Sequence, residues 1–573
     1  MAVYARVKEG VYFDSIKLMS VASELRHLPG VVDSAVVMAT AANKAILQTA
    51  ELLTPAAADA APNDLIIAVK TDLAGAEAAA ALDRAEALLH AGQRAGGAAQ
   101  ELRPKTLRGA LKSYPQANVV VISVAGRYAV DEAWEALRRG LHVLLFSDNV
   151  ALEDEIALKT YANAQGLLLM GPGAGTTILN GAALGFANVL PAGPIGIVSA
   201  AGTGLQEVST LLARRGVGVT QGLGVGGRDL SAAVGGRMFL AALAALQADP
   251  ATEILVLVSK PPAPAVAQAV LAQAARSAKP TVICFLGGDA ELAADLPHVR
   301  CAATLTEAAD LAARLAGAES SYSQFDFTQQ AADLRARLQP DQRWLRGLFA
   351  GGTLCYEAQV VWRDLLAEPV WSNAPLDPAR RLDDSAVSRG HTAVDLGEEE
   401  FTVGRLHPML DNALRIRRLL EEARDPQVGV ILLDVVLGYG AHPDPAAELA
   451  PAVMQAKRSA QANGRELIVI ASVTGADADP QNRRRQVERL AAAGVIVCNS
   501  NAAAAHLAAQ IVNRQSPIVN RQSSIVNRQS SIVNRQSPIV NRQSPIVNRQ
   551  SSIANRKSQT PCPFPPSSTS PSP

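Results

Sequence analysis

The sequence predicts an α/β protein with several doubly wound parallel-sheet domains, one Rossmann-like and two flavodoxin-like, followed by a disordered repeat tail. Three observations lead to this fold class. Strand-like apolar stretches alternate with helical stretches over residues 1–510, which is typical of layered α/β domains. The elements of residues 193–318 recur in the same order at 346–510. A short, near-perfect repeat fills residues 511–573.

Length and composition narrow the class of protein. A chain of 573 residues is too long for one core and corresponds to roughly three to four domains of about 150 residues. The five cysteines show no CxxC or metal-ligand spacing, so we expect neither a disulfide framework nor a metal site. The sequence shows no leader-like segment and no long apolar stretch, so we expect a cytoplasmic protein without a membrane span.

The charge balance differs between the expected folded region and the tail. The chain has 53 basic and 53 acidic residues in total. Residues 511–573 hold eight of the basic residues and none of the acidic ones, which leaves 45 basic against 53 acidic residues in the rest. We therefore do not expect the folded part to bind nucleic acid, although local basic pockets for phosphate are compatible with this balance.

The first two expected domains occupy residues 1–95 and 96–192. The first alternates strand-like stretches such as "DLIIAVKT" with helical ones such as "SIKLMSVASELRHL". The second runs from "NVVVISVAG" through the amphipathic "VDEAWEALRRG" to "HVLLFSD" and the glycine turn of "GLLLMGPGAG", which indicates a Rossmann-like unit. The three-glycine fingerprint is missing after its first strand, so we do not expect NAD.

Two further α/β domains follow at 193–318 and 346–510, joined by a linker at 319–345. Each begins with an apolar strand and a Gly-Thr turn that opens a helix. Each continues through a glycine-rich loop to the strand "ILVLVSK" or "VGVILLDVV", and then to "PTVICFLGG" or "ELIVIASVTG". The shared order predicts an internal duplication.

The tail is of a different kind. "IVNRQSP" or a near copy starts at Ile511 and recurs every seven residues before a Pro/Ser-rich end. Adjacent Ile and Val do not form a coiled-coil seam, and proline recurs at the seventh position. We therefore expect residues 511–573 to be a disordered heptapeptide-repeat tail with no assigned function.

The two Gly-Thr turns, "SAAGTGLQE" and "FAGGTLCYEA", are candidate anion sites. A strand that turns directly into a helix leaves backbone N–H groups at the helix N-terminus, where the peptide dipoles favour an anion. The hydroxyl of Thr203 or Thr353 can cap the helix or donate to a phosphate oxygen. For either copy alone, a simple N-cap is the alternative. We expect the two matched turns to face one shared anion.

These motifs resemble those of the FdrA family, acyl-CoA-synthetase-like proteins related to the α-subunit of succinyl-CoA synthetase. "GPIGIVSAAGTGLQE" and "GGTLCYEA" are similar to the start of the ligase domain of that subunit, and "GLLLMGPGAGTTILNG" to the end of its CoA-binding domain. Further FdrA-like stretches are "GFANVLP", "GRLHPMLD", "LLDVVLGYGAHPDPA" and "VTGADADPQNR". The resemblance covers about residues 1–510. It implies a CoA-binding-like domain at 96–192 and two succinyl-CoA-ligase-like domains.

In the resembling synthetases a phosphorylated histidine sits between two such helix N-termini. The resemblance places phosphate or substrate binding on Gly202, Thr203, Gly352 and Thr353, and catalytic roles on Glu207 and Glu357. The Gly-His-Ala-Gly loop of the family is missing after "PTVICFLGG" and from "VTGADADPQNRRRQ". We therefore do not expect a phosphohistidine at the standard position.

Two histidines and a glycine loop complete the expected site. His391 and His407 fall in predicted loops of the second ligase-like domain, at the edge where parallel sheets place ligands. Either could act as nucleophile or general acid/base, with a structural turn role as the alternative. Gly171, Gly173 and Asn180 of "GPGAGTTILNG" are expected to line an acyl or CoA pocket.

The resemblance also implies cofactors, partners and a function. CoA is an expected ligand, whereas magnesium and nucleotide are expected only through a partner subunit, because no ATP-grasp domain is found. We expect an oligomer or hetero-complex that handles an acyl or carbamoyl phosphate, by acid-thiol ligation or by carbamoyl transfer, with a link to ureide and nitrogen catabolism. The alternative is a non-catalytic CoA- or phosphometabolite-binding scaffold or regulatory subunit.

Overall fold

A computed structural model describes most of the first 514 residues, and one compact unit spans residues 1–513. Almost all of the expected repeat tail, from residue 515, and part of the expected linker, 319–324, lie outside the described residues. The described ranges are 2–11, 13, 15–26, 28–72, 75–90, 104, 106–288, 293, 295–318, 325–402 and 405–514.

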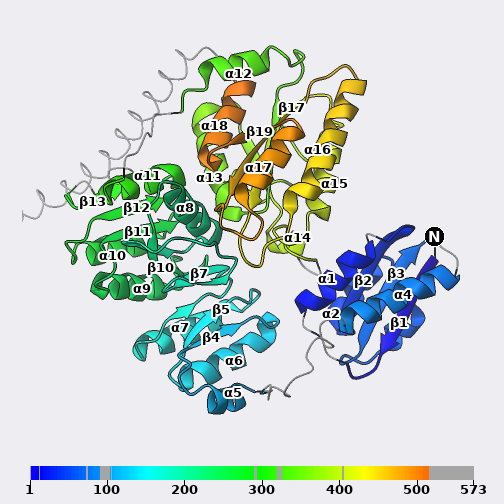
Figure 1. Cartoon of the computed structure of the whole chain (residues 1–573), viewed down its shortest axis with the longest axis horizontal. Helices are drawn as coiled ribbons and strands as arrows, with labels where there is room; N and C mark the ends of the chain where they lie inside the picture. Colours follow the sequence, from blue (N-terminus) through cyan, green and yellow to red (C-terminus); the bar gives the residue numbers. More distant parts are fainter. Residues whose placement is uncertain are drawn as a thin grey trace, which may run out of the picture. The chain divides into compact units, whose positions relative to one another are not determined.

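The N-terminal domain is a three-stranded antiparallel sheet with helices on both faces (Figure 1). The strand order is β1-β3-β2, so the middle strand pairs with both neighbours. Thr40 and Thr54 cap two of its helices through their side chains, as the preference for Thr at this position predicts. Its elements are β1 (Ala2–Lys8), α1 (Ser15–Arg26), β2 (Val31–Met38), α2 (Ala41–Thr49), α3 (Pro55–Asp59), β3 (Leu65–Thr71) and α4 (Gly75–His90).

The Rossmann-like domain has a parallel sheet of order β4-β5-β6. A hairpin follows it, with Asn180 and Gly181 in the left-handed turn that such two-residue connections require. The hairpin lies before residue 192, yet it pairs with β10 of the next sheet. The elements are α5 (Leu107–Ser113), β4 (Val119–Ile122), α6 (Gly126–Arg138), β5 (His142–Leu145), α7 (Leu152–Ala164), β6 (Leu169–Met170), β7 (Thr176–Leu179) and β8 (Ala182–Gly185).

Two parallel sheets with the same central order follow. The first reads β13-β12-β11-β9-β10 and is extended by β7 and β8, and the second reads β19-β18-β17-β14-β16 and is extended by β15. Strands β9 and β14 are therefore equivalent, which is the internal duplication expected from the sequence. The strands are β9 (Ile195–Ser199), β10 (Val219–Gly224), β11 (Ile254–Ser259), β12 (Thr281–Phe285), β13 (Val299–Cys301), β14 (Trp344–Phe349), β15 (Val370–Ser372), β16 (His391–Asp395), β17 (Val428–Val436), β18 (Ile468–Thr474) and β19 (Val495–Cys498).

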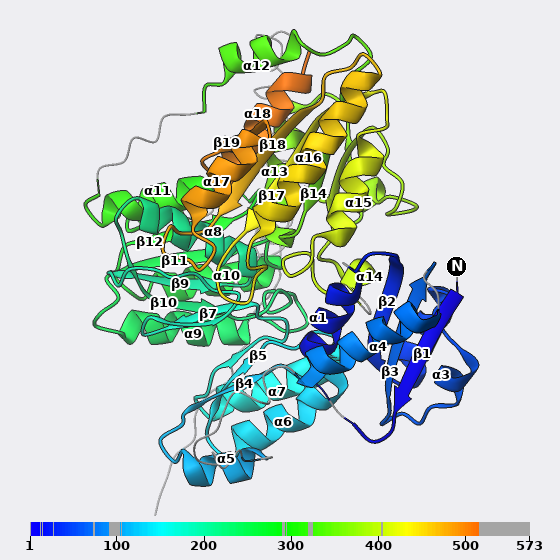
Figure 2. The same ribbon diagram turned by 45° about the vertical axis from the view of Figure 1, so that its right-hand side comes forward.

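Four helices form the layer where these two domains meet (Figure 2). Helices α8 and α11 of the first domain and α13 and α18 of the second share one continuous apolar core with the central strands of both sheets. Helix α18 extends two residues past the expected boundary at residue 510. The helices are α8 (Gly202–Arg214), α9 (Arg237–Ala248), α10 (Pro264–Ala274), α11 (Leu305–Leu315), α12 (Thr328–Arg335), α13 (Gly352–Leu365), α14 (Glu399–Thr402), α15 (Ala413–Glu422), α16 (Pro445–Ala462), α17 (Arg483–Ala492) and α18 (Asn501–Val512).

Within the described part of the chain, every helix is too short or too polar to cross a membrane.

Candidate functional site

The starts of α8 and α13 face one another. A Cβ atom on Gly351 would lie 2.9 Å from Thr203 Cγ2 and 3.0 Å from its Oγ1. Reciprocally, a Cβ atom on Gly204 would lie 3.0 Å from Thr353 Cγ2. At distances this short a Cβ atom would push the facing side chains apart, so glycine allows the two helix starts to approach closely. The two Gly-Thr turns thus meet at one junction, as the sequence predicts.

The two turns are not matched, because a carboxylate of the protein occupies the α13 turn. Asp434 of β17 accepts hydrogen bonds from the N–H groups of Ala350 and Gly351, both at 2.7 Å. Its Oδ1 also pairs with Arg415 at 3.0 Å, and both side chains are buried. The expectation of two equal cradles for one external anion is therefore wrong, since one cradle already holds an anion.

A second carboxylate, Asp395 at the end of β16, borders the same turn. A Cβ atom on Gly352 would lie 2.5 Å from Asp395 Oδ2, and the N–H of Gly397 donates to Oδ1 at 2.9 Å. The Asn373 side chain binds both the N–H and the C=O of Asp395 at 2.9 Å. Burial raises the pKa of Asp395 to about 7, although the charge of Lys260 acts to lower it. Asp395 is not among the site residues predicted from the sequence.

The strand ends that flank the α8 turn carry no charged residue at the level where the helix begins. Ser199 ends β9 and pairs with Gly224 and Val258 on the neighbouring strands. The equivalent Phe349 of β14 pairs instead with Asp395. The N–H of Ala201 donates to Ser199 Oγ at 3.0 Å, and no side chain caps α8.

The first helical N–H groups of α8 are open to a ligand. Those of residues 202–204 have no hydrogen-bond partner in the part of the chain that the structure describes, and the same holds for residues 352–354 of α13. The two turns differ in exposure and in charge: Thr203 is partly exposed and Thr353 is 4% exposed, and the carboxylates of Asp395 and Asp434 border only the α13 turn at the strand ends. Negative charge next to the α13 turn opposes a second anion there, which favours the α8 turn as the place for an anion from outside.

The glycine loop after β6 reaches this turn only in part. A Cβ atom on Gly202 would lie 3.8 Å from Thr176 Oγ1 and 4.0 Å from the amide nitrogen of Gly175. Gly171 and Gly173 belong to the same loop, with positive φ angles of 116° and 66°. Asn180 does not reach the junction: it lies at the hairpin turn, where its N–H donates to Gln221 Oε1 at 2.8 Å.

The two predicted catalytic glutamates bind the N-termini of helices in the opposite domain. Glu207 of α8 accepts from the N–H of Asn501 at 3.1 Å and from the hydroxyl of Thr474 at 2.5 Å. Glu357 of α13 accepts from the N–H of Leu305 at 2.7 Å and from Asn501 Nδ2 at 2.8 Å. Burial raises the pKa of Glu357 to about 7. With all four carboxylate oxygens bound, these contacts favour a capping role over a catalytic one.

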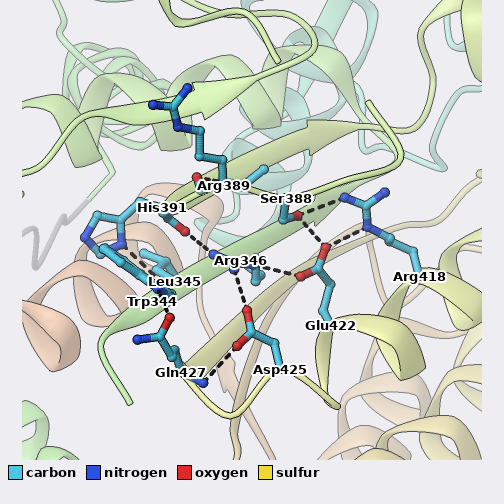
Figure 3. A network of polar contacts seen from close by, with 12 residues as sticks. Trp344, Leu345, Arg346, Ser388, Arg389, His391, Arg418, Glu422, Asp425 and Gln427 are labelled. Carbon is cyan, nitrogen blue, oxygen red and sulfur yellow. Dashed lines mark hydrogen bonds and ion pairs between the residues drawn. The ribbon is translucent and has the colours of Figure 1, made fainter. Parts of the chain in front are cut away.

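His391 lies away from the junction, contrary to expectation. It is the first residue of β16, whereas ligands of parallel sheets bind at the carboxyl ends of the strands. Its Nδ1 accepts from the N–H of Leu345 at 3.2 Å. Figure 3 shows it beside Arg346, which binds Glu422 and Asp425. This buried ionic network joins β14 to α15, so His391 has a structural setting.

His407 does lie at the junction. Its Nδ1 accepts from the N–H of Met409 at 3.2 Å, and a Cβ atom on Gly397 would lie 2.7 Å from its Nε2. Burial lowers the pKa of His407 to about 4, and nearby Arg415 adds to this effect. The imidazole is therefore neutral at pH 7. Because Nδ1 accepts, the hydrogen-bond network assigns the proton to Nε2, which makes His407 a donor beside Asp395.

Metal ligands and a reactive thiol are not part of this arrangement. Among the described residues, no group of three or more His, Cys, Asp or Glu side chains could hold a metal ion. Burial raises the pKa of the Cys355 thiol, which lies in the first turn of α13, well above its usual value. Cys355 therefore stays protonated and serves as a buried filler.

Comparison with known protein families identifies two segments. Residues 348–511 match the family described as CoA-ligase. Residues 1–104 match a family described as the AllF heavy metal-associated domain. This N-terminal stretch contains no cysteine.

Comparison with curated proteins gives three informative relatives. The uncharacterized protein YahF of Escherichia coli K12 is 44% identical over 514 residues, which are 89% of this chain and 99% of YahF. The succinate–CoA ligase [ADP-forming] subunit alpha of Methanothermobacter thermautotrophicus is 28% identical over 25% of this chain and 48% of its own length. The ADP-forming sulfoacetate-CoA ligase subunit SauD of Bilophila wadsworthia is 25% identical over 32% of this chain and 63% of its own length.

Solved structures add little beyond this. The dinucleotide-forming acetyl-coenzyme A synthetase 1 of Ca. Korarchaeum cryptofilum matches with a TM-score of 0.27 and 14% identity, over 69% of this chain and 82% of the other. The ATP citrate lyase of Methanothrix soehngenii matches with a TM-score of 0.28 and 21% identity, over 39% of each chain. Scores this low support no conclusion about function.

Proposed function

Because the chain belongs to the family of the Escherichia coli protein YahF and carries a CoA-ligase domain, we propose that it is a subunit of an acyl-CoA ligase-like enzyme. In this proposal an acyl phosphate or carbamoyl phosphate binds at the start of α8, and its acyl group is transferred to CoA. Homology to CoA-ligase subunits supports the ligase-type activity and the use of CoA.

One observation carries this proposal: α8 begins with a partly exposed glycine turn whose N–H groups are free among the described residues. The phosphoryl group would accept hydrogen bonds from the N–H groups of residues 202–204, and the Thr203 hydroxyl would donate to it. Donors fixed by the backbone stabilise the charge that develops on a leaving phosphate without reorganisation. The neutral His407 imidazole would add a donor on the α13 side.

The further details of the proposal come from the FdrA-like motifs. They favour a hetero-complex in which a partner subunit supplies nucleotide and magnesium, and they favour a substrate from ureide or nitrogen catabolism. Carbamoyl transfer to or from phosphate is the variant of the reaction that fits such a substrate.

A turnover assay with matched threonine variants tests the proposal. Purified protein would be mixed with CoA and acetyl phosphate or carbamoyl phosphate, and both phosphate release and thioester formation would be measured. Thr203→Val removes a hydroxyl that faces the ligand and should lower kcat/KM about tenfold or more, as loss of a hydrogen bond to a charged group does. Thr353→Val is the matched control and should leave kcat/KM nearly unchanged, because Asp434 occupies its turn.

The second candidate function is a non-catalytic scaffold that binds CoA or a phosphometabolite. The capping of both Glu207 and Glu357 favours it, since neither carboxylate is left for chemistry. Binding of CoA and phosphate without phosphate release, in every combination with nucleotide and partner subunits, would support the scaffold and contradict the ligase.

A further inference from the structure

We propose that Asp395 is the general base that takes the thiol proton when CoA attacks an acyl phosphate at the start of α8. This inference rests on the proposed function and adds to it a residue that the sequence motifs do not indicate.

The position of Asp395 suits this role. Its backbone is fixed by Asn373 and its Oδ1 by the N–H of Gly397. Its Oδ2 lies against Gly352, at the junction of the two turns, and has no hydrogen-bond partner among the residues that the structure describes. One oxygen is thus anchored while the other keeps an unpaired acceptor site beside Gly352, which is the arrangement that a general base needs once a substrate lies at the junction.

The other candidate bases at the junction are already engaged. Both oxygens of Asp434 accept backbone N–H groups, and Oδ1 also binds Arg415. Glu207 and Glu357 each have both oxygens bound. His407 uses its Nδ1 lone pair to accept from Met409, so its Nε2 can only donate. Asp395 is left as the acceptor.

The charged side chains near Asp395 come from three segments of the chain. Lys260, which follows β11, lowers the pKa of Asp395, whereas Glu398 on its own loop and Asp434 on β17 raise it. Burial is the largest effect, and the result is a pKa of about 7. A carboxyl with a pKa near the working pH can both take up and release a proton, which is what a general base needs.

An open cleft of about 550 Å³ lies next to the loop that follows Asp395, which is itself only 2% exposed. One wall is the loop 148–151 before α7, in the Rossmann-like domain, together with Arg228, and the other is formed by residues 397–399 and Thr402. Gly397, which lines the cleft, is the residue that donates to Asp395. The walls carry three carboxylates against one arginine, so they suit the neutral, amide-bearing arm of CoA better than its phosphates.

The proposed step conserves atoms and charge. The CoA sulfur forms a bond to the acyl carbon, and the bond from that carbon to the phosphate oxygen breaks. The thiol proton moves to Asp395 Oδ2 and then to the departing phosphate, which leaves as hydrogen phosphate. Neither an oxidant nor a reductant is needed.

The experiment compares Asp395→Asn, Asp395→Ala and wild type in the CoA and acetyl phosphate assay across pH 5.5–8.5. In the wild type, kcat should rise with pH through about 7 as Asp395 loses its proton, and then level off. In Asp395→Asn, kcat should fall roughly 10²- to 10⁴-fold, the KM for acetyl phosphate should stay within a few-fold, and the pH-dependent rise should vanish. Formate should restore part of kcat in Asp395→Ala, because it can occupy the vacated space.

A second measurement does not depend on turnover. Because Glu357 also has a pKa of about 7, infrared difference spectra would be recorded during pH titrations of full-length Glu357→Gln and of the double variant that also carries Asp395→Asn. A carboxyl signal that titrates near pH 7 should be present in Glu357→Gln and lost in the double variant. If this signal persists in the double variant, the proposal is overturned. An active wild type whose pH profile is unchanged in Asp395→Asn overturns the role of Asp395 alone. A wild type that forms no thioester overturns the proposed function and the role of Asp395 with it.

Discussion

The two Gly-Thr turns have nearly the same local sequence but opposite electrostatic settings. The strands beside β9 present Gly224 and Val258 at the level where α8 begins. The strands beside β14 present Asp395 and Asp434 at the start of α13. Duplication of a domain can therefore keep a backbone motif and change its electrostatic setting through two residues on neighbouring strands. In our proposal one copy receives an anion, whereas the other is bordered by carboxylates of the protein.

Removal of the buried carboxylate of Asp434 should produce the largest effect on stability. In Asp434→Ala the buried guanidinium of Arg415 loses its charge partner, and the N–H groups of Ala350 and Gly351 lose their acceptor. We expect the free energy of unfolding, measured by urea denaturation, to fall by about 3–5 kcal/mol. The exposed Asp131→Ala is the control and should change it by less than about 0.5 kcal/mol. If Asp434→Ala lowered the free energy of unfolding by less than about 1 kcal/mol, the proposed difference between the α8 and α13 turns would be contradicted.

The pH dependence of stability should reveal the buried glutamate of α13. The folded protein holds the proton of Glu357 up to about pH 7, whereas the unfolded chain releases it near the ordinary glutamate pKa of 4.5. Between these values the contribution of Glu357 to stability falls by about 1.4 kcal/mol for each unit of rising pH. Glu357→Gln should make the slope of the unfolding free energy between pH 5 and 7 less steep by this amount, while the contribution of Asp395, whose pKa is also about 7, stays.

The control for this measurement is Glu153→Gln, because Glu153 is exposed on the first turn of α7. In Glu153→Gln the slope of the unfolding free energy against pH should equal that of the wild type. An unchanged slope in Glu357→Gln would mean that Glu357 is ionised throughout this range, against the assignment made above.

Adding one methyl group at Gly202 should weaken phosphate binding at the α8 turn. In Gly202→Ala the new Cβ atom would make ordinary contacts, at 3.8 Å from Thr176 Oγ1, yet it would fill the space between the turn and the glycine loop. We expect the fold to persist and the Kd for inorganic phosphate, measured by calorimetry, to rise about tenfold, which corresponds to about 1.4 kcal/mol. Phosphate affinity equal to wild type would place the anion elsewhere.

The smallest expected effect on stability comes from Ser199, the neutral hydrogen-bond acceptor at the α8 turn. Ser199 Oγ accepts from the N–H of Ala201 at 3.0 Å and donates to its carbonyl. Ser199→Ala should cost about 1 kcal/mol in unfolding free energy, as loss of a neutral hydrogen bond does. A cost as large as that of Asp434→Ala would show that both turns depend equally on their side-chain acceptors.

Much of the fold could be predicted from the sequence because its determinants are local. The alternation of apolar strands and amphipathic helices, the turn of Asn180 and Gly181, and the two Gly-Thr turns depend on neighbouring residues. The capping of α18 by Glu207 and of α11 by Glu357 could not be predicted, because it depends on how four helices from two domains pack. Alignment of "VTQGLG" with "HTAVD" would have indicated Asp395, since strand ends beside the central strand lie at the ligand edge.

The histidines illustrate the same limit. His391 and His407 both follow glycine-containing stretches, and sequence pattern alone does not tell the first residue of a strand from a loop at its other end. The structure places His391 in the network around Arg346 and only His407 at the junction.

The central claim is that an external anion binds the start of α8 and not the start of α13. A crystal structure of the full-length protein soaked with phosphate tests it most directly. The expected result is a phosphate within hydrogen-bond distance of the N–H groups of residues 202–204, with Asp434 still bound to Ala350 and Gly351. A phosphate on the α13 turn with Asp434 displaced, or an α8 turn that stays empty at saturating phosphate, would contradict the claim.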